Sequence, residues 1–154
     1  MWKSFFNTLS RVFYKLAYKL ILFVWFFYRP TVRGVYIAVW YGKKILIIKN
    51  SYKKQFTIPC GRIKRGENLT AAAVRELSEE VGIKVYESEL QFIGQYTFNY
   101  KYVSEIGNFF ELEISNLPNI SVDNREVVWA RFTAPDQALL LELNPLVRSY
   151  IDLR

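Results

Sequence analysis

The pattern of hydrophobic and polar positions divides the chain at Arg29-Pro30. Before this point apolar and aromatic residues dominate, single bases interrupt them, and neither glycine nor proline occurs. Glycine and proline are the residues that most disfavour a helix interior, so their absence permits one continuous helix. The pattern therefore predicts a helical N-terminal segment over residues 1–30 and a separate domain over residues 31–154.

After this point, runs of β-branched and aromatic residues alternate with turn residues, as expected for strands. Residues 31–41 predict a first strand, and the apolar run 45–48 predicts a strand buried on both faces. Interleaved strands and helices indicate an α/β sandwich, with helices covering a mixed sheet. The remaining predicted elements are an extended segment over 56–61, a hairpin of 90–103 and 108–115 turning at Ile106-Gly107, a strand over 125–133, a helix from Pro135 to about Glu142, and a short helix after Asn144-Pro145.

One further helix is predicted over residues 69–81, with Asn68 as its N-cap and Gly82 as its left-handed C-terminal residue. Three glutamates on this helix stand at i, i+3 and i+4, a spacing that places them on one side. The small side chains of Ala72 and Ala73 are expected to keep that side open. An apolar stripe is expected to face the core. The glutamates are Glu76, Glu79 and Glu80, and the stripe is Thr70, Val74, Leu77 and Val81.

Composition narrows the chemistry that these elements can perform. The chain of 154 residues is 51% hydrophobic, which suffices for a core and excludes disordered and low-complexity classes. It contains one cysteine and no histidine. The single cysteine excludes an internal disulfide and indicates a reducing compartment such as the cytoplasm. The absence of histidine excludes Ser-His-Asp and Cys-His mechanisms and histidine-ligated zinc.

The net charge of +7 is unevenly distributed. Residues 1–34 carry six bases and no acid, whereas the rest of the chain carries 15 bases and 14 acids. The nearly neutral body argues against a nucleic-acid-binding protein, and the cationic character belongs to the N-terminal segment.

Within that segment, polar and basic residues recur every four positions opposite an apolar and aromatic face. The run 20–28 is apolar all round, but it is shorter than the roughly 20 residues that span a bilayer. A basic amphipathic helix of this kind suits an anionic membrane surface, here the inner face of the cytoplasmic membrane. Packing on the body or on a second subunit, as in a homodimer, is the alternative. The recurring positions are Lys3, Asn7, Arg11, Lys15 and Lys19, and the apolar face is Trp2, Phe5, Phe6, Leu9, Val12, Phe13, Leu16 and Leu20.

The glutamate cluster suggests a bound metal ion. Three neighbouring carboxylates repel one another, and the helix of residues 69–81 contains no lysine that would pair with them. A hard divalent cation with oxygen ligands would relieve the repulsion. The preceding loop is flexible and basic, and is therefore suited to a phosphate-bearing ligand. Its residues are Gly61, Arg62, Lys64, Arg65 and Gly66.

Residues 61–83, GRIKRGENLTAAAVRELSEEVGI, resemble the Nudix box, G-x5-E-x7-R-E-U-x-E-E-x-G-U, where U is a bulky aliphatic residue. Every specified position matches. The resemblance implies a Nudix α/β/α sandwich that binds Mg²⁺ or Mn²⁺ and hydrolyses the diphosphate linkage of a nucleoside diphosphate joined to a group X. The matching residues are Gly61, Glu67, Arg75, Glu76, Leu77, Glu79, Glu80, Gly82 and Ile83.

The same resemblance assigns roles to the box residues. Glu76 and Glu80 would be metal ligands, Glu79 a further ligand or the activator of water, and the Gly61 carbonyl an additional ligand. Arg75, paired with Glu67, would fix the helix against the loop, and with Glu76 and Glu79 it completes the predicted catalytic set. Bound metal ions would neutralise the diphosphate and activate the attacking water. Substrate-binding candidates are Arg62, Lys64 and Arg65, and Glu105 and Glu126 are candidates for an assisting carboxylate from outside the box.

One position departs from the family pattern. The residue before the box is often glycine, but here it is Cys60, which would be strained if its φ were positive. A tolerated small residue is favoured over a reactive thiol, and Trp129 is interpreted as a structural aromatic residue. Other functions remain open, namely a non-catalytic nucleotide-sensing module and a membrane-surface adaptor. A Nudix-type prenyl diphosphate isomerase is disfavoured, because that enzyme's metal site contains histidine.

Overall fold

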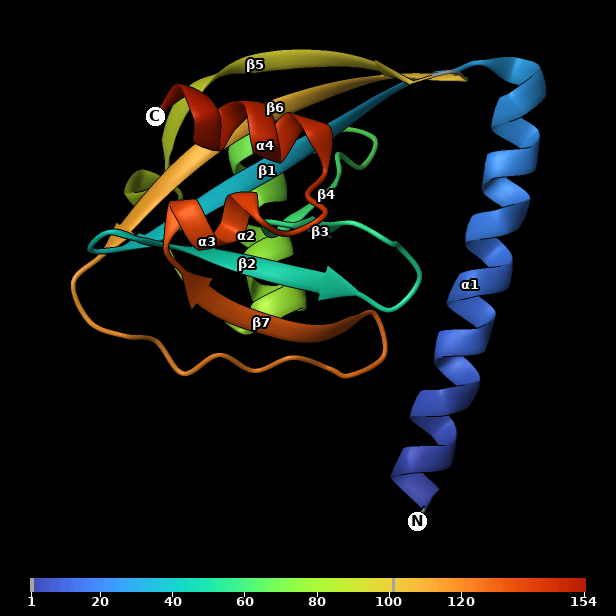
Figure 1. Ribbon diagram of the computed structural model, residues 1–154, viewed down its shortest axis with the longest axis horizontal. Coiled ribbons are helices and arrows are strands. Elements are labelled where there is room, and N and C mark those ends of the chain that lie inside the picture. The colour runs from blue at the N-terminus through green and yellow to red at the C-terminus, as the bar shows by residue number, and fades with distance from the viewer. Residues whose placement is uncertain (1, 101) are drawn as a thin grey trace.

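The computed structural model describes residues 2–100 and 102–154, and a mixed β-sheet lies at its centre (Figure 1). The strand order is β3-β2-β1-β6-β5, with β4 pairing to β1 and β7 pairing to β2. Strands β1 and β6 run parallel along the whole length of β1, and the other pairs are antiparallel. The predicted mixed sheet is therefore confirmed. The strands are β1 Thr31–Tyr41, β2 Lys44–Asn50, β3 Phe56–Thr57, β4 Cys60–Arg62, β5 Gln91–Tyr100, β6 Val103–Ile114 and β7 Val127–Thr133.

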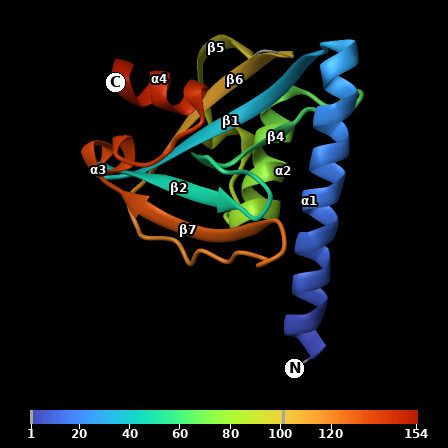
Figure 2. The same ribbon diagram turned by 45° about the vertical axis from the view of Figure 1, so that its right-hand side comes forward.

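Helices cover both faces of this sheet, so the body is an α/β/α sandwich (Figure 2). Alternate residues of β1 enter opposite cores, since Val35 and Ile37 pack towards α2 while Tyr36 and Ala38 pack towards α4. The run Ile45–Ile48 is fully buried, as predicted for a strand covered on both sides. The helices are α1 Trp2–Tyr28, α2 Leu69–Val81, α3 Pro135–Leu139 and α4 Pro145–Leu153, with the 3₁₀ turn η1 at Glu87–Glu89.

The predicted hairpin turn at Ile106-Gly107 is wrong. Strand β5 ends at Tyr100 and β6 begins at Val103, so Gly107 lies inside β6 opposite Gly34 of β1. A Cβ atom at Gly107 would come within 2.9 Å of the Tyr36 ring, so the glycine permits close packing and marks no turn.

Two predicted boundaries also shift. The strand predicted from Arg125 begins at Val127, because the Asp123 carboxylate accepts hydrogen bonds from the backbone N–H groups of residues 125–127 and Asn124 has a φ of 60°. The helix predicted to reach Glu142 ends at Leu139.

Helix α1 runs as one continuous helix along the side of the body (Figures 1 and 2). At its end Arg29 has a φ of 43° and donates its backbone N–H to the Trp25 carbonyl, which turns the chain into β1. The side chains of Trp2, Lys3 and Phe5, which the sequence assigns to the two faces, lie outside the described residues. Among the helices that the structure describes, none combines the length and hydropathy needed to cross a membrane.

Candidate metal and diphosphate site

Helix α2 has capping residues at both ends, and it places two glutamates against the sheet. The Asn68 side chain accepts a hydrogen bond from the Ala71 N–H at 2.7 Å, and Gly82 adopts the left-handed conformation with a φ of 72°. Glu76 and Glu80, one turn apart, are buried on the side facing β4, with exposures of 9% and 6%. Burial of two adjacent carboxylates is costly, so this pair is the feature of α2 that its packing alone does not explain.

The third glutamate is more exposed than the buried pair, and the two alanines lie elsewhere than predicted. The side chain of Glu79 is 56% exposed, pairs with Lys64 and shares Arg75 Nη1 with Glu76. Ala72 and Ala73 are fully buried in the core, so the prediction that they keep the acidic side open is wrong. Core packing selects small residues here because α2 lies close against the sheet.

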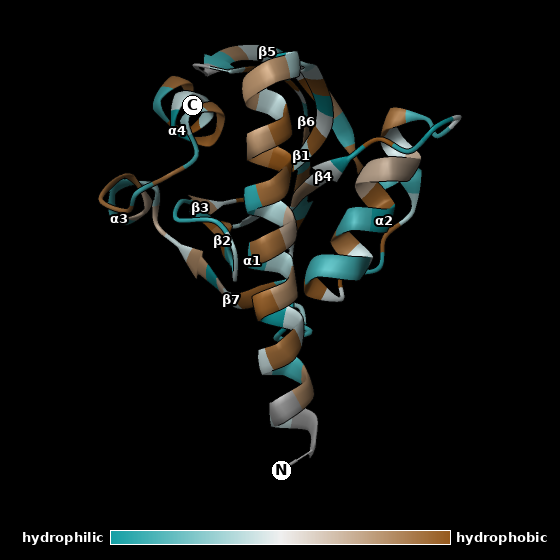
Figure 3. Cartoon of the chain, turned by 90° about the vertical axis from the view of Figure 1, so that its right-hand side faces the viewer, coloured by the Kyte–Doolittle hydropathy of each residue, from teal (hydrophilic) through white to brown (hydrophobic). Residues whose placement is uncertain are grey.

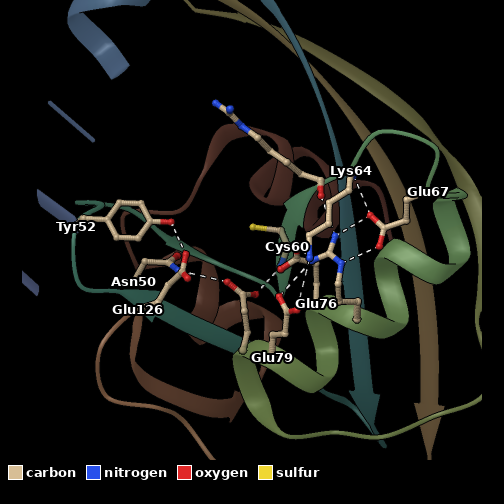
Figure 4. A network of polar contacts seen from close by, with 11 residues as sticks. Asn50, Tyr52, Cys60, Lys64, Glu67, Glu76, Glu79 and Glu126 are labelled. Atoms are coloured by element: carbon tan, nitrogen blue, oxygen red, sulfur yellow. Dashed lines mark hydrogen bonds and ion pairs between the residues drawn. The ribbon is translucent and has the colours of Figure 1, made fainter. Parts of the chain in front are cut away.

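Arg75 ties α2 to the preceding loop (Figure 4). Its guanidinium donates to both oxygens of Glu67, from Nε at 2.7 Å and from Nη2 at 2.9 Å, and also to the Arg62 carbonyl at 3.0 Å. Its Nη1 donates to Glu76 at 2.5 Å and to Glu79 at 3.2 Å. Hydrogen bonds from Arg75 lower the pKa of Glu67 to about 2. The bidentate pair therefore fixes the loop that carries the basic residues.

Steric space, core packing and backbone conformation explain the residue types at four other box positions. A Cβ atom at Gly61 would collide with the carboxyl group of Glu76, so only glycine leaves room for that carboxylate. Leu77 and Ile83 enter the core that α2 shares with the sheet. At Gly82, a side chain would be strained by the positive φ.

Glu80 is the most enclosed carboxylate of the site. It accepts the Cys60 backbone N–H at 2.8 Å and the Asn50 side-chain amide at 3.4 Å. Burial raises its pKa to about 8 despite the Cys60 hydrogen bond. Burial also raises the pKa of Glu76, although Arg75 acts in the opposite direction. Nearby positive charge would favour the ionised form of both carboxylates.

The side-chain oxygen atoms around Glu80 suit a hard cation as ligands, although they are not already arranged as a metal site. Beside Glu80, the buried Oδ1 of Asn50 has no hydrogen-bond partner. Carboxylate and amide oxygens are the ligands that Mg²⁺ prefers. Within residues 2–100 and 102–154, however, no three acidic, cysteine or histidine side chains already form a metal-holding group. Arg75 donates to one oxygen of Glu76, Oε1, so a metal ion bound by Glu76 would share this carboxylate with Arg75.

Both carboxylates predicted from outside the box reach the same cavity, which has a volume of about 420 Å³. Glu126 accepts a hydrogen bond from the Tyr52 hydroxyl at 2.8 Å, and Glu105 accepts one from the Tyr36 hydroxyl. The charge of Glu126 contributes to the raised pKa of both Glu76 and Glu80. Glu126 therefore interacts electrostatically with the buried pair.

The three residues predicted to bind phosphate lie in different places. Arg62 lines the cavity, with its guanidinium 5.1 Å from the centroid of the Trp25 ring. Lys64 points to Glu79, with its Nζ 3.8 Å from that carboxylate. Arg65 is exposed and does not line the cavity.

Sequence reasoning missed Lys53, which also lines the cavity. Burial lowers the pKa of Lys53, but neighbouring acidic groups, Glu80 and Glu105 among them, raise it overall, so the side chain stays cationic. Asn50 and Tyr52 were missed as well. Asn50 is the last residue of β2, and Tyr52 and Lys53 follow it in a polar loop. The spacing of these residues from the box carries no signal of contact.

Cys60 fits the prediction of a tolerated small residue, whereas Trp129 is 36% exposed and its structural role stays a prediction. Cys60 pairs with Tyr36 in the sheet and is not among the described residues with positive φ. Burial raises the pKa of its thiol to about 12, which disfavours the reactive thiolate. The Trp129 ring packs edge-on against Phe56 at 5.5 Å between centroids.

This α/β/α sandwich with a complete box at its buried carboxylates defines the class of the protein. The family model described as "NUDIX domain" matches residues 30–153. The chain therefore belongs to the NUDIX family, whose fold and domain indicate a hydrolase. None of the curated proteins compared with the chain matches it significantly.

Solved structures share the fold at low sequence identity. An Ap4A hydrolase from C. elegans in a binary complex has a TM-score of 0.66 and 18% identity, covering 79% of this chain and 93% of that one. The E. coli dihydroneopterin triphosphate pyrophosphohydrolase has a TM-score of 0.68 and 18% identity, covering 79% and 92%. The NUDIX domain of Shewanella oneidensis NrtR, complexed with ADP ribose, has a TM-score of 0.68 and 14% identity, covering 79% and 84%.

Proposed function

We propose that the protein is a Mg²⁺-dependent pyrophosphohydrolase that cleaves the diphosphate linkage of a nucleoside diphosphate derivative. The observation that carries this proposal is the buried pair Glu76 and Glu80, held beside a cavity that also contains the cations Lys53 and Arg62. Two ionisable carboxylates are costly in a protein interior unless a positive ligand compensates them. The names of the Ap4A hydrolase and the dihydroneopterin triphosphate pyrophosphohydrolase, which share the fold, support polyphosphate chemistry.

Each residue of the site has a proposed task. Glu76 and Glu80 would hold the metal ion, with the Gly61 carbonyl as an added ligand, and bound Mg²⁺ or Mn²⁺ would neutralise the diphosphate and activate water. Lys53 and Arg62 bind phosphate oxygens. Arg75 positions Glu76 through its fixed guanidinium.

The assisting carboxylate is assigned by position. Glu126 accepts a proton from the attacking water, since it lines the cavity and its carboxylate is oriented by Tyr52. Exposed Glu79, paired with Lys64, is assigned a supporting electrostatic role.

The test is a panel of nucleoside triphosphates, nucleotide sugars, dinucleoside polyphosphates and coenzyme A esters, incubated with the purified full-length protein and Mg²⁺. We expect release of phosphate or a nucleoside monophosphate from at least one class, and complete loss in EDTA. Full activity in EDTA would refute the metal-dependent mechanism.

The variant Glu80→Gln tests the assigned ligand. It preserves size and helix propensity while removing the charge, and we expect kcat to fall by about 100-fold or more, because metal stabilisation of the transition state is worth several kcal/mol. Its thermal unfolding should stay cooperative. Glu87→Gln, at an exposed position in η1, is the matched control and should retain wild-type kcat. Near-normal turnover of Glu80→Gln would remove Glu80 from the ligand set.

A nucleotide-sensing module is the second candidate function, because the structurally similar NUDIX domain of NrtR was solved with ADP ribose. Calorimetric binding of ADP ribose by this chain without hydrolysis in Mg²⁺ would favour this alternative. Turnover of any compound in the panel would favour the enzyme.

We also propose that α1 associates reversibly with an anionic membrane surface, as an adaptor segment on the enzyme body. Seven apolar side chains on the side of α1 turned away from the body are 49% to 69% exposed, and they define its outer face. In Figure 3 hydrophobic residues recur along the side of α1 that faces the viewer. Exposed Lys15 and Lys19 flank this face. The outer face consists of Leu9, Val12, Phe13, Leu16, Leu20, Phe23 and Phe27.

A further inference from the structure

The cavity of about 420 Å³ has two chemically different sides. The body contributes all the charged residues that line it. The side formed by α1 carries no charged residue, and we call these residues the inner face of α1. A ligand that fills the cavity must therefore be charged at one end and largely apolar at the other. The charged lining residues are Lys53, Arg62, Glu76, Glu105 and Glu126, and the inner face is Tyr14, Ala17, Tyr18, Ile21 and Trp25.

Aromatic contacts hold the inner face against the body. The rings of Tyr14 and Tyr18 lie 5.9 and 5.3 Å from the ring of Tyr52, measured between centroids. Tyr52 also donates its hydroxyl hydrogen to Glu126, so a single side chain contacts both α1 and the acidic side of the cavity (Figure 4). The wall that α1 builds is therefore continuous with the site of the proposed reaction.

These contacts are limited, which leaves room for a ligand between α1 and the body. No residue of α1 with a described side chain is buried. The Nε of Arg11 also donates to the Asn124 carbonyl at 2.8 Å. Further contacts of α1 are a ring contact between Phe26 and Tyr102 and the guanidinium groups of Arg62 and Arg125 over the rings of Trp25 and Phe6. The family match begins at residue 30, after α1 has ended at Tyr28, so this wall is an addition to the NUDIX domain.

We propose that the inner face of α1 binds the organic group of the substrate, and that this group is apolar, so the substrate is an amphiphilic diphosphate. The proposal rests on the proposed metal-dependent diphosphate hydrolysis, and it places an apolar group where the proposed function places a nucleoside. The hydroxyl groups of a sugar would need hydrogen-bond partners, and the inner face offers only two tyrosine hydroxyls and one indole N–H. A membrane that received the outer face of α1 would also be the place where amphiphilic diphosphates reside.

The test uses the full-length protein in Mg²⁺ and three soluble probes: geranyl diphosphate, methyl diphosphate and cytidine diphosphate. In each, water attacks one phosphorus and the bridging P–O bond breaks, giving inorganic phosphate and the organic monophosphate. The probes therefore differ only in the group that α1 would contact. We expect kcat/KM to be about tenfold or more higher for geranyl than for methyl diphosphate.

Variants of the inner face test whether α1 causes the preference for geranyl over methyl diphosphate. Tyr18→Ala should lower the ratio of kcat/KM for geranyl over methyl diphosphate about tenfold, mainly through the KM of the geranyl probe. Tyr18→Phe, which keeps the ring, should restore the ratio. Leu22→Ala is the matched control, because Leu22 lies on α1 but belongs to neither the inner nor the outer face. Its ratio should equal that of the wild type.

Equal losses on geranyl and methyl diphosphate in Tyr18→Ala would overturn the inference, since they indicate a structural role only. A preference for cytidine diphosphate that Tyr18→Ala abolishes would overturn the apolar assignment and place a nucleobase on α1. If a compound of the panel above is hydrolysed but none of these three probes is, the proposed function stands and this inference is overturned. If neither the panel nor the probes are hydrolysed, the proposed function fails, and calorimetry with geranyl diphosphate decides this inference. Binding that depends on Tyr18 would support it, whereas absent binding would overturn it.

Discussion

At the scale of single residues, the box glutamates show how surroundings set the charge of identical side chains. Glu67 receives hydrogen bonds from Arg75 and from the Lys64 backbone N–H, and its pKa is lowered to about 2. Glu80 is enclosed and its pKa is raised to about 8. The sequence motif treats both as required glutamates, but one fixes a loop while the other is the proposed ligand of a metal ion.

The lowered pKa of Glu67 predicts how pH affects stability. A carboxyl group with a folded pKa below its unfolded value stabilises the fold above the unfolded pKa, and this contribution disappears as pH falls through the folded pKa. We therefore expect Glu67→Gln to have a lower Tm than wild type at pH 6 to 8, and the difference to shrink between about pH 4.5 and pH 2. Thermal unfolding of both proteins by circular dichroism measures it. A Tm difference that is independent of pH would show that the ion pair contributes no stability.

Cys60 offers a second prediction at this scale. Because burial raises the pKa of its thiol to about 12, the native protein should react with iodoacetamide much more slowly than free cysteine at pH 8. The labelling rate, followed by mass spectrometry, should reach that of free cysteine only in denaturant. Cys60→Gly, which restores the common family residue, should keep its hydrolase activity. Rapid labelling of the native protein would restore the hypothesis of a reactive thiol.

At the scale of elements, predictions succeeded where local chemistry decides the structure. Helix α2 spans Leu69–Val81 as predicted, because Asn68 and Gly82 are local capping signals that need no tertiary partner. The hairpin turn failed because Gly107 resembles a turn residue in sequence, whereas its actual role is to make room for Tyr36 on the adjacent strand. The β-branched and aromatic residues of β1 predicted a strand, but its parallel pairing with β6 depends on distant sequence.

Helix α1 carries the element-scale prediction. Exposed bases near an anionic leaflet contribute about 1 kcal/mol each, and the outer face adds burial of its apolar side chains. We expect the full-length protein to sediment with vesicles of anionic lipid, and less so in high salt. A protein truncated to begin at Arg29 should stay in solution, remain folded and keep EDTA-sensitive hydrolysis of a small diphosphate.

Leu16→Asp tests the outer face without deleting α1, and it should reduce sedimentation with vesicles. Leu140→Asp is the control, because Leu140 is 87% exposed beyond α3 and does not belong to α1. A truncated protein that unfolds, together with a full-length protein that ignores vesicles, would assign α1 to the fold of the body instead.

At the scale of the whole molecule, the position of α1 was beyond the reach of sequence reasoning. Helical periodicity identifies which residues share a face, but it does not identify the surface that the face will contact. The partners of Tyr14 and Trp25 are Tyr52, in the loop after β2, and Arg62, at the end of β4. The sequence of the box identified the carboxylates. The inner face of α1 opposite them could be identified only from the structure.

The exposed outer face predicts how the molecule behaves without lipid. A continuous apolar surface that is exposed to water favours self-association. We expect sedimentation-velocity experiments on the lipid-free protein to show association that increases with concentration, and the double variant Leu16→Glu, Phe23→Glu to remain monomeric. Leu140→Glu serves as the control and should associate like wild type. Association unchanged in the double variant would place the contact elsewhere.

The order of elements along the chain has a consequence for synthesis on the ribosome. Strand β1 cannot complete its pairing until β6, which ends at Ile114, has left the exit tunnel. Helix α1 emerges long before that point, so at usual rates of translation it is available for several seconds before its body can fold. During this interval its inner face also lacks the aromatic partners that later cover it. A nascent chain of this design would therefore meet a membrane, or a chaperone, with both faces of α1 free.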